Sequence, residues 1–292
     1  MTVKWKEHGP APVVLSIAGY DPSSGAGITA DIKTIAAHGC YGATCATALT
    51  VQSTQGVRAV EAVRPEIIRA TLRELAADLS FSAVRIGMLG SAAVVEAVSE
   101  FLENTRPRNV VLDPVVRSSS GAELLDAAGV ALLKRRLLPL VSVVTPNIDE
   151  VAVLSEALAA QPSLTALGLL DTKAEPGLRA AVAAAEALLN SGVGAAVVTG
   201  GHLETPTDVL LWRKEGILQV RVFPSRRIES RSTHGTGCAF ATSLACSLAL
   251  GISLPEGVAR AQQYVLRAIE TAEPLGRGFG PINHLWPLRE RF

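Results

Sequence analysis

The chain has 292 residues, 48% of them hydrophobic, and its 27 basic residues balance its 27 acidic residues to a formal net charge of zero. This composition excludes a disordered chain, and the lack of excess positive charge argues against a protein that binds nucleic acid or a charged membrane surface. A chain of this length can bury roughly three quarters of its unfolded surface, so we expect a large folded core.

Short β-branched runs alternate with longer helical patterns, which is typical of repeated βα units and a mostly parallel sheet. Strands are predicted over Val13–Ala18, Ala43–Leu49, Ala83–Met88, Asn109–Asp113, Val141–Thr145 and Ala195–Thr199. Helices are predicted over Gly27–His38, Pro65–Leu79, Ser91–Asn104, Glu123–Leu137, Ile148–Ala157 and Glu175–Asn190. A hairpin of Val209–Arg213 and Leu218–Phe223 follows, then two helices from about Gly237 and Pro255. We therefore predict one α/β domain, with residues 159–175 as a surface loop.

The cysteines give no sign of a metal site or of secretion. Cys40, Cys45, Cys238 and Cys246 form neither a CxxC motif nor a cluster with histidine. The first residues, MTVKWKEHGPAP, lack the apolar core of a signal peptide, so reduced thiols and a cytoplasmic location are expected. The longest apolar stretch, residues 238–250, is shorter than the roughly 18 residues of a membrane span, and no membrane association is predicted.

The first predicted strand is followed by a glycine-rich turn, Gly19–Gly27, that leads into a helix carrying Asp31. Such a turn at a helix N-terminus can present backbone N–H groups to a polar ligand. The alternative is a tight connection that binds nothing. The pattern is not the GxGxxG of dinucleotide-binding proteins.

Two further strand ends carry residues suited to a flat heterocycle. Gln52 follows the second strand, and its amide can both donate to and accept from a heteroaromatic ring. Met88 ends the third strand, and its thioether suits an apolar ring face. The alternatives are a surface position for Gln52 and core packing for Met88.

Acidic residues follow the fourth and fifth predicted strands. Asp113 and Glu150, with Asn147 nearby, are plausible holders of a nucleotide-bound Mg²⁺, because Mg²⁺ keeps several waters and takes few carboxylates. The alternative reading is helix capping by Asn147 and Asp149, and both can hold together.

The strongest single signal is Ser232–Cys238, which runs directly into an alanine-rich helix. The N–H groups of Gly235, Thr236, Gly237 and Cys238 would form an anion hole for a transferred phosphoryl group. Cys238 would lie in the first helical turn, a position that lowers a thiol pKa and suits a base for a substrate hydroxyl. The alternative is that Cys238 is only a small buried residue.

Eight segments occur in order: residues 18–34, 39–54, 86–89 (IGML), 113–116 (DPVV), 145–151 (TPNIDEV), 200–202 (GGH), 233–238 (THGTGC) and 276–284 (GRGFGPINH). Together, over about residues 13–284, they resemble the ribokinase-like superfamily and, within it, the bacterial hydroxymethylpyrimidine and phosphomethylpyrimidine kinases. The resemblance implies a three-layer α/β/α sandwich with a mostly parallel central sheet.

The resemblance also implies a reaction: ATP and Mg²⁺ would phosphorylate 4-amino-5-hydroxymethyl-2-methylpyrimidine and then its monophosphate. By position, the residues that match the family's pyrimidine pocket are Gln52, Gly19, Asp31, Met88 and Val115. Those that match the nucleotide and metal region are Asn147, Thr199, Gly201, Asp113 and Glu150. Relatives are commonly homodimers, and the apolar composition permits one.

Two positions depart from the family pattern. Thr199 and Ser119 stand where many members carry lysine, and we hypothesise that Arg117 supplies part of the missing positive charge. A thiol at the position of Cys238 also occurs in one group of pyridoxal kinases, so a pyridoxal or pyridoxine kinase is an open alternative. A non-catalytic pyrimidine or phosphate sensor is a second alternative, because Thr199 and Ser119 replace the usual lysines. An adenosine or sugar kinase is less favoured, since those relatives usually carry aspartate where Cys238 stands.

Overall fold

A computed structural model describes residues 10–118, 121–154, 176–201, 203 and 205–289. Its strands are β1 (Val13–Tyr20), β2 (Tyr41–Ser53), β3 (Gly56–Ala62), β4 (Phe81–Ile86), β5 (Val110–Leu112), β6 (Val143–Val144), β7 (Ala195–Val198), β8 (Thr207–Lys214) and β9 (Ile217–Pro224). Its α-helices are α1 (Gly27–Ala37), α2 (Pro65–Asp78), α3 (Ala92–Thr105), α4 (Ala127–Leu132), α5 (Ile148–Leu154), α7 (Pro176–Asn190), α8 (Thr236–Ala249), α9 (Leu254–Glu270) and α10 (Trp286–Arg289).

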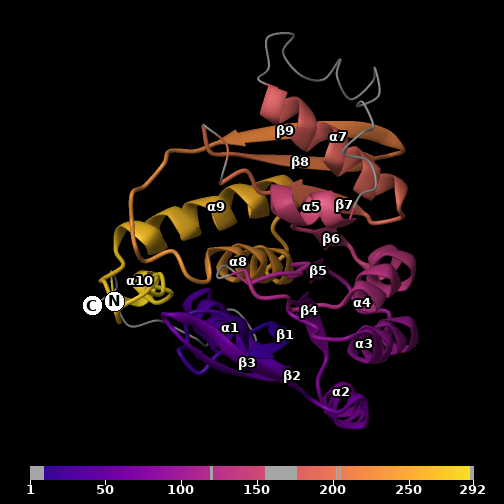
Figure 1. Ribbon diagram of the computed structural model, residues 1–292. Helices are drawn as coiled ribbons and strands as arrows, with labels where there is room; N and C mark the ends of the chain where they lie inside the picture. Colours follow the sequence, from indigo (N-terminus) through magenta and orange to yellow (C-terminus); the bar gives the residue numbers. More distant parts are fainter. Residues whose placement is uncertain (1–9, 119–120, 155–175, 202, 204, 290–292) are drawn as a thin grey trace.

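All of these strands form one continuous sheet in the order β3-β2-β1-β4-β5-β6-β7-β8-β9 (Figure 1). The six neighbouring strands β2, β1, β4, β5, β6 and β7 pair in parallel. At one edge of the sheet β3 pairs antiparallel with β2, and at the other edge β8 and β9 continue the sheet in antiparallel pairs. The mostly parallel sheet and the C-terminal hairpin predicted from the sequence are therefore confirmed.

Helices cover both faces of the sheet, as Figure 1 shows. Successive strand residues point to opposite faces, so Leu15 and Ile17 of β1 belong to the core beneath α2, α3 and α7, and Val14 belongs to the core beneath α1, α8 and α9. The central strands β1 and β4 to β7 are apolar in most positions because both of their faces are covered. This arrangement confirms the predicted three-layer α/β/α sandwich.

Two central strands end earlier than predicted. β5 stops at Leu112 and β6 at Val144, each just before a residue followed by proline (Pro114 and Pro146). Proline has no N–H to donate to a strand ladder, so pairing cannot continue through it. Asp113 and Thr145 therefore lie directly after the two strands, at the same edge of the sheet.

Two predictions of secondary structure are wrong. The predicted helix Glu123–Leu137 begins only at Ala127, because Asp126 caps the backbone N–H of Gly129, and it ends in a π-helical turn over Leu133–Leu137. Strand β3 was not predicted, because five of its seven residues are exposed and the strand carries none of the apolar alternation of a half-buried strand.

The predicted loop over residues 159–175 and the end of the predicted helix Ile148–Ala157 lie outside the described residues. Among the helices that the structure describes, none is long and apolar enough to cross a membrane.

Candidate active site

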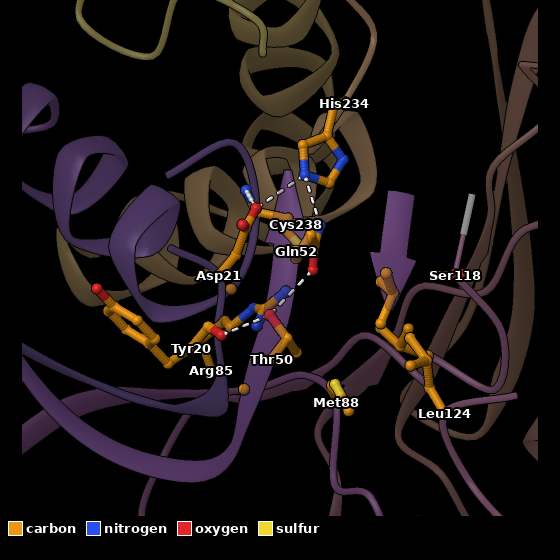
Figure 2. A pocket seen from close by; sticks show the side chains of 15 residues that line it. Tyr20, Asp21, Thr50, Gln52, Arg85, Met88, Ser118, Leu124, His234 and Cys238 are labelled. Atoms are coloured by element: carbon orange, nitrogen blue, oxygen red, sulfur yellow. Dashed lines mark hydrogen bonds and ion pairs between the residues drawn. The ribbon is translucent and has the colours of Figure 1, made fainter. Parts of the chain in front are cut away.

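A pocket opens at the carboxyl ends of β1 and β4, beside the N-termini of α1 and α8 (Figure 2). This is where open parallel sheets place ligands. The lining residues come from five separate segments: Gly19, Tyr20, Asp21, Ala26, Gly27, Thr50, Gln52, Val57, Arg85, Met88, Val115, Ser118, Leu124, His234 and Cys238. The structure thus brings together five residues that the sequence proposed for the site: Gly19, Gln52, Met88, Val115 and Cys238.

Gly19 and Met88 form one wall of the pocket. A Cβ on Gly19 would lie only 2.9 Å from the Met88 sulfur, so the thioether packs against the bare backbone of β1. Met88 is 9% exposed and also packs with Ala48 and Leu124, which makes this wall apolar. Such a surface suits the face of a flat ring.

Asp21 organises the turn between β1 and α1. Its Oδ1 accepts hydrogen bonds from the N–H and hydroxyl of Ser23, and its Oδ2 accepts from the N–H groups of Gly25 and Ala26 and from His234 Nε2 at 2.8 Å. Burial opposes ionisation of Asp21, but the bonds from His234 and Ser23 outweigh it and hold the pKa of this carboxyl below its ordinary value. Asp21 therefore links the glycine-rich turn to the loop before α8.

A buried charge cluster lies beneath the pocket, and sequence reasoning missed its centre. Arg85 of β4 is fully buried; its Nη2 lies 2.8 Å from Asp113 Oδ2 and its Nη1 lies 3.0 Å from Asp31 Oδ2. Burial raises the pKa of both carboxyl groups, and the positive charge of Arg85 opposes that shift. A single arginine inside the apolar run AVRI was the available signal, because a buried guanidinium requires acidic partners.

Asp31 lies behind the pocket and does not belong to its lining. Its side chain is fully buried, and it accepts hydrogen bonds from the hydroxyls of Ser16 and Thr242 at 2.6 and 2.7 Å in addition to its pair with Arg85. In this structure Asp31 reaches the pocket only through Arg85.

The prediction of a lowered pKa for Cys238 is wrong. Burial raises the pKa of its thiol to about 12; the charge of Arg85 opposes the shift, while Asp113 and Asp31 add to it. The helix N-terminus was expected to favour the thiolate, but a sulfur anion here would sit beside two carboxylates with one guanidinium between them. Cys238 is therefore a neutral thiol at pH 7.

The loop before α8 has the form expected of an anion hole. Gly235 adopts a left-handed conformation with φ of +89°, and a Cβ there would overlap the carbonyl oxygen of Gly25. Gly237 has open space where a Cβ would stand. The first N–H groups of an α-helix have no acceptor within the helix. The Thr236 N–H donates to the Thr233 carbonyl oxygen at 3.4 Å, and those of Gly237 and Cys238 are suited to an anionic ligand.

Asn147 and Glu150 form a reciprocal cap at the start of α5. The Asn147 side chain accepts from the Glu150 N–H, and the Glu150 carboxylate accepts from the Asn147 N–H, both at 2.9 Å. Helix capping by Asn147, which the sequence left open, is thus present, with Glu150 rather than Asp149 as the second residue. Burial and the nearby charge of Asp113 raise the pKa of Glu150 to about 8.

The Asp113 and Glu150 pair fits a magnesium ion better than a metal that requires a full protein cage. In the described part of the chain, no three His, Cys, Asp or Glu residues gather in a way that could hold a metal. Mg²⁺ is commonly held by one or two carboxylates, waters and substrate phosphates. Two carboxyl groups whose pKa values are raised by burial beside one another would also gain from a cation.

The remaining nucleotide-region residues lie outside the pocket lining. The Thr199 N–H donates to the Pro146 carbonyl at 2.9 Å, and a bridge pairs Thr199 with Asn147, so these two positions are adjacent. Gly201 is exposed with open space around it. Arg117 is exposed and pairs with Glu123 through its backbone.

This sandwich, with a glycine-rich turn and a helix N-terminus facing one pocket, is the fold of the ribokinase-like kinases. An ADP complex of Bacillus subtilis pyridoxal kinase shares it with a TM-score of 0.79 and 28% identity, covering 96% of this chain and 99% of that one. The phosphomethylpyrimidine kinase family model matches residues 21–283, and the chain belongs to that family.

Two relatives are similar over almost all of this chain. The hydroxymethylpyrimidine/phosphomethylpyrimidine kinase of Streptomyces coelicolor is 40% identical over 279 residues, covering 96% of each chain. The thiamine biosynthesis bifunctional protein of Geobacter sulfurreducens is 41% identical over 278 residues, covering 94% of this chain. The chain spans about half the length of this second relative, 53%.

Proposed function

We propose that the protein transfers the terminal phosphoryl group of ATP to the hydroxymethyl group of 4-amino-5-hydroxymethyl-2-methylpyrimidine, and then phosphorylates the resulting monophosphate to the diphosphate. The observation that carries the proposal is the pocket itself, which Gln52 and Met88 line together with Cys238 from the start of α8. One site serves both steps, because the second substrate differs only at the group that faces α8.

The pyrimidine would lie between the thioether of Met88 and the opposite side of the pocket, with Gly19 and Val115 beside it. Gln52 would hydrogen-bond the aminopyrimidine edge. The first-turn N–H groups of Gly235, Thr236 and Gly237 would hold the phosphoryl group during an in-line transfer, in which positioning and charge stabilisation supply most of the rate enhancement.

Cys238 would orient the substrate hydroxyl. Because its thiol is protonated at pH 7, the sulfur cannot take the hydroxyl proton, which would pass instead to an oxygen of the transferred phosphoryl group. The Arg85 guanidinium lines the pocket beside Cys238. The role of Cys238 is therefore one of positioning.

Asp113 and Glu150 would hold Mg²⁺, which when bound neutralises charge on the nucleotide phosphates. The nucleotide would be contacted by Asn147, which caps α5 together with Glu150, by its neighbour Thr199, and by Gly201. Arg117 would supply positive charge near the phosphates in place of the lysines found in many relatives. On this proposal Arg117→Ala raises the KM for ATP or for the monophosphate.

Pyridoxal kinase is the second candidate, favoured by the 28% identical pyridoxal kinase structure that binds ADP. The 40% identity to a pyrimidine kinase over nearly the full chain favours the pyrimidine. An aminopyrimidine also offers the Gln52 amide an amino group beside a ring nitrogen, an arrangement that pyridoxal lacks. A non-catalytic sensor on this fold is the third candidate.

The test is mass-spectrometric analysis of products made from Mg-ATP and, in separate reactions, the pyrimidine alcohol, its monophosphate and pyridoxal. We expect diphosphate from both pyrimidines and little pyridoxal phosphate. Cys238→Ala, which removes the positioning contact, is expected to slow turnover by up to about 100-fold, whereas Cys246→Ala, deep in the same helix, serves as the matched control. Product from pyridoxal alone would assign the second candidate, and no product at all the third.

We further propose a cytoplasmic homodimer. All four cysteines are free thiols, which suits a reducing compartment. Leu49 and Val51 on one face of β2 are 51% and 63% exposed, which favours burial against a second copy. Light scattering on the purified protein tests the dimer directly.

A further inference from the structure

The Gln52 side-chain amide lies between two partners, one at each end. One end is 3.1 Å from His234 Nε2 and the other is 3.1 Å from the Thr50 hydroxyl (Figure 2). An amide has a donor end and an acceptor end, so these neighbours determine which way it faces.

The end near His234 must be the oxygen. His234 Nε2 lies 2.8 Å from Asp21 Oδ2, and every other contact of that carboxylate is a donor from Ser23, Gly25 or Ala26. A carboxylate only accepts, so His234 Nε2 carries a hydrogen and donates. The same N–H can be shared with a second acceptor, which only the Gln52 oxygen provides.

The end near Thr50 is then the nitrogen, and the Thr50 hydroxyl is compatible with it. This hydroxyl lies 3.0 Å from the Tyr20 carbonyl oxygen, to which it can donate its single hydrogen. Its oxygen lone pairs are then available to accept from the Gln52 amide nitrogen.

The His234 contact therefore requires this orientation, and the Thr50 contact is compatible with it. In Figure 2 the nitrogen is drawn at His234, which would set two donors against each other there. A half-turn about the last side-chain bond exchanges oxygen and nitrogen and satisfies all four groups.

We propose that His234, held by Asp21, and Thr50, held by Tyr20, lock the Gln52 amide with its oxygen toward His234, and so select a ring with an exocyclic amino group beside a ring nitrogen in a single orientation. This inference rests on the proposed function and names positioning residues for it. After the two contacts, the amide keeps one lone pair and one N–H for a ligand in the pocket.

The orientation of the amide also determines where the reacting group points. The amide oxygen accepts from the amino group on the His234 side, and the amide nitrogen donates to the ring nitrogen on the Thr50 side. In the proposed substrate the amino group stands between that ring nitrogen and the hydroxymethyl carbon. The hydroxymethyl group therefore lies beyond His234, on the side where Gly235–Cys238 begins α8. A reversed amide would turn the ring over and point the hydroxymethyl group away.

The experiment compares the amino substrate with its 4-oxo analogue, which exchanges the donor and acceptor at this edge. Both kcat/KM with ATP and binding by calorimetry without ATP are measured. We expect the wild-type protein to prefer the amino compound by about 10- to 100-fold. The ratio of the kcat/KM values for the two compounds, measured on one enzyme preparation, does not depend on the fraction of enzyme that is folded.

The matched variants are Thr50→Val and Thr50→Ser. Valine cannot accept from the amide, so the preference should fall by about threefold, while serine keeps the oxygen and the preference. Adding His234→Phe to Thr50→Val releases both ends, and the ratio should approach one.

Equal preference in Thr50→Val and Thr50→Ser, or a wild-type protein that takes both compounds equally, would overturn the inference while leaving the kinase function in place. An amino compound that is neither bound nor phosphorylated would overturn the proposed function, and this inference with it.

Discussion

Cys238 shows how burial can reverse an expectation based on position in a helix. The start of a helix stabilises a thiolate by a modest amount that falls off within one turn. Burial raises the pKa of this thiol and two carboxylates add to the shift, while the guanidinium of Arg85 and a hydrogen bond from the Gly27 backbone oppose it. The balance favours the neutral thiol, so the sulfur keeps its proton at pH 7.

A raised thiol pKa predicts a distinctive pH dependence of alkylation. Cys238 is partly exposed to the pocket, so iodoacetamide can reach it. Because only the thiolate reacts and the pKa is about 12, the labelling rate should rise about tenfold per pH unit from pH 7 to pH 10 without levelling off. Peptide-resolved mass spectrometry separates Cys238 from the three other cysteines, and a plateau below pH 8 would contradict the assignment.

Single residues divide into those that the sequence could predict and those that it could not. Gln52, Met88 and Cys238 were found because they follow predicted strands or begin a predicted helix, and the pocket does contain them. Arg85 was missed because its partners, Asp31 and Asp113, are remote in the chain and meet only through the sheet. The pKa of Cys238 was mispredicted for the same reason.

At the scale of elements, the start of α8 combines a structural glycine with a glycine that leaves open space. Gly235 needs its positive φ and its closeness to Gly25, whereas Gly237 has nothing within 4 Å of the place where a Cβ would stand. The two positions are two residues apart, so they make a matched pair for separating stability from function.

Gly237→Ala should leave the fold as stable as before, because alanine is a better helix former than glycine. Its methyl group would occupy space proposed for the phosphoryl group, so turnover should fall by about 10- to 100-fold. Gly235→Ala should instead lower the free energy of unfolding by about 1–3 kcal/mol. Urea unfolding and steady-state kinetics measure the two effects; full turnover in Gly237→Ala would show that the transferred group passes elsewhere.

Elements were predictable where the core imposes a pattern. The buried parallel strands are continuous apolar runs, and the long helices have one apolar face. The edge strand β3 escaped prediction because solvent, not core, faces most of its side chains. The start of α4 was misplaced because residues 123–126 can be read as helical until the Asp126 cap is seen.

At the scale of the molecule, the C-terminal segment is fastened to the glycine-rich turn by His284. Its Nε2 lies 3.2 Å from the Gly25 carbonyl oxygen, its Nδ1 lies 3.4 Å from the Thr34 hydroxyl, and its own carbonyl accepts from Tyr264 at 2.6 Å. Burial lowers the pKa of His284 to about 4, so the ring is neutral in the folded protein at pH 7.

This shift predicts an acid-sensitive contribution to stability. The unfolded chain takes up a proton at His284 near its ordinary pKa of 6.5, while the folded chain does so only near 4. The free energy of unfolding should therefore fall as pH drops between these values, by at most about 3 kcal/mol from this residue. His38 shifts in the same direction, so the comparison is between wild type and His284→Gln. Urea titrations at pH 7 and pH 4.5 should give the variant the smaller loss; identical losses would assign the effect to other groups.

The pairing of His234 with Asp21 spans 213 positions of the chain, and that of Thr242 with Asp31 spans 211. Contacts so remote in sequence form late in folding, because the entropy cost of closing a long loop must be met before the contact can form and stabilise the fold. During synthesis, β1 and the glycine-rich turn leave the ribosome long before residue 238 is made. A nascent chain can assemble its first βα units early, yet until residue 238 is made it lacks both His234, which contacts the Gln52 amide, and the start of α8. On the proposed function, a chain that ends before residue 238 therefore cannot bind its ligands.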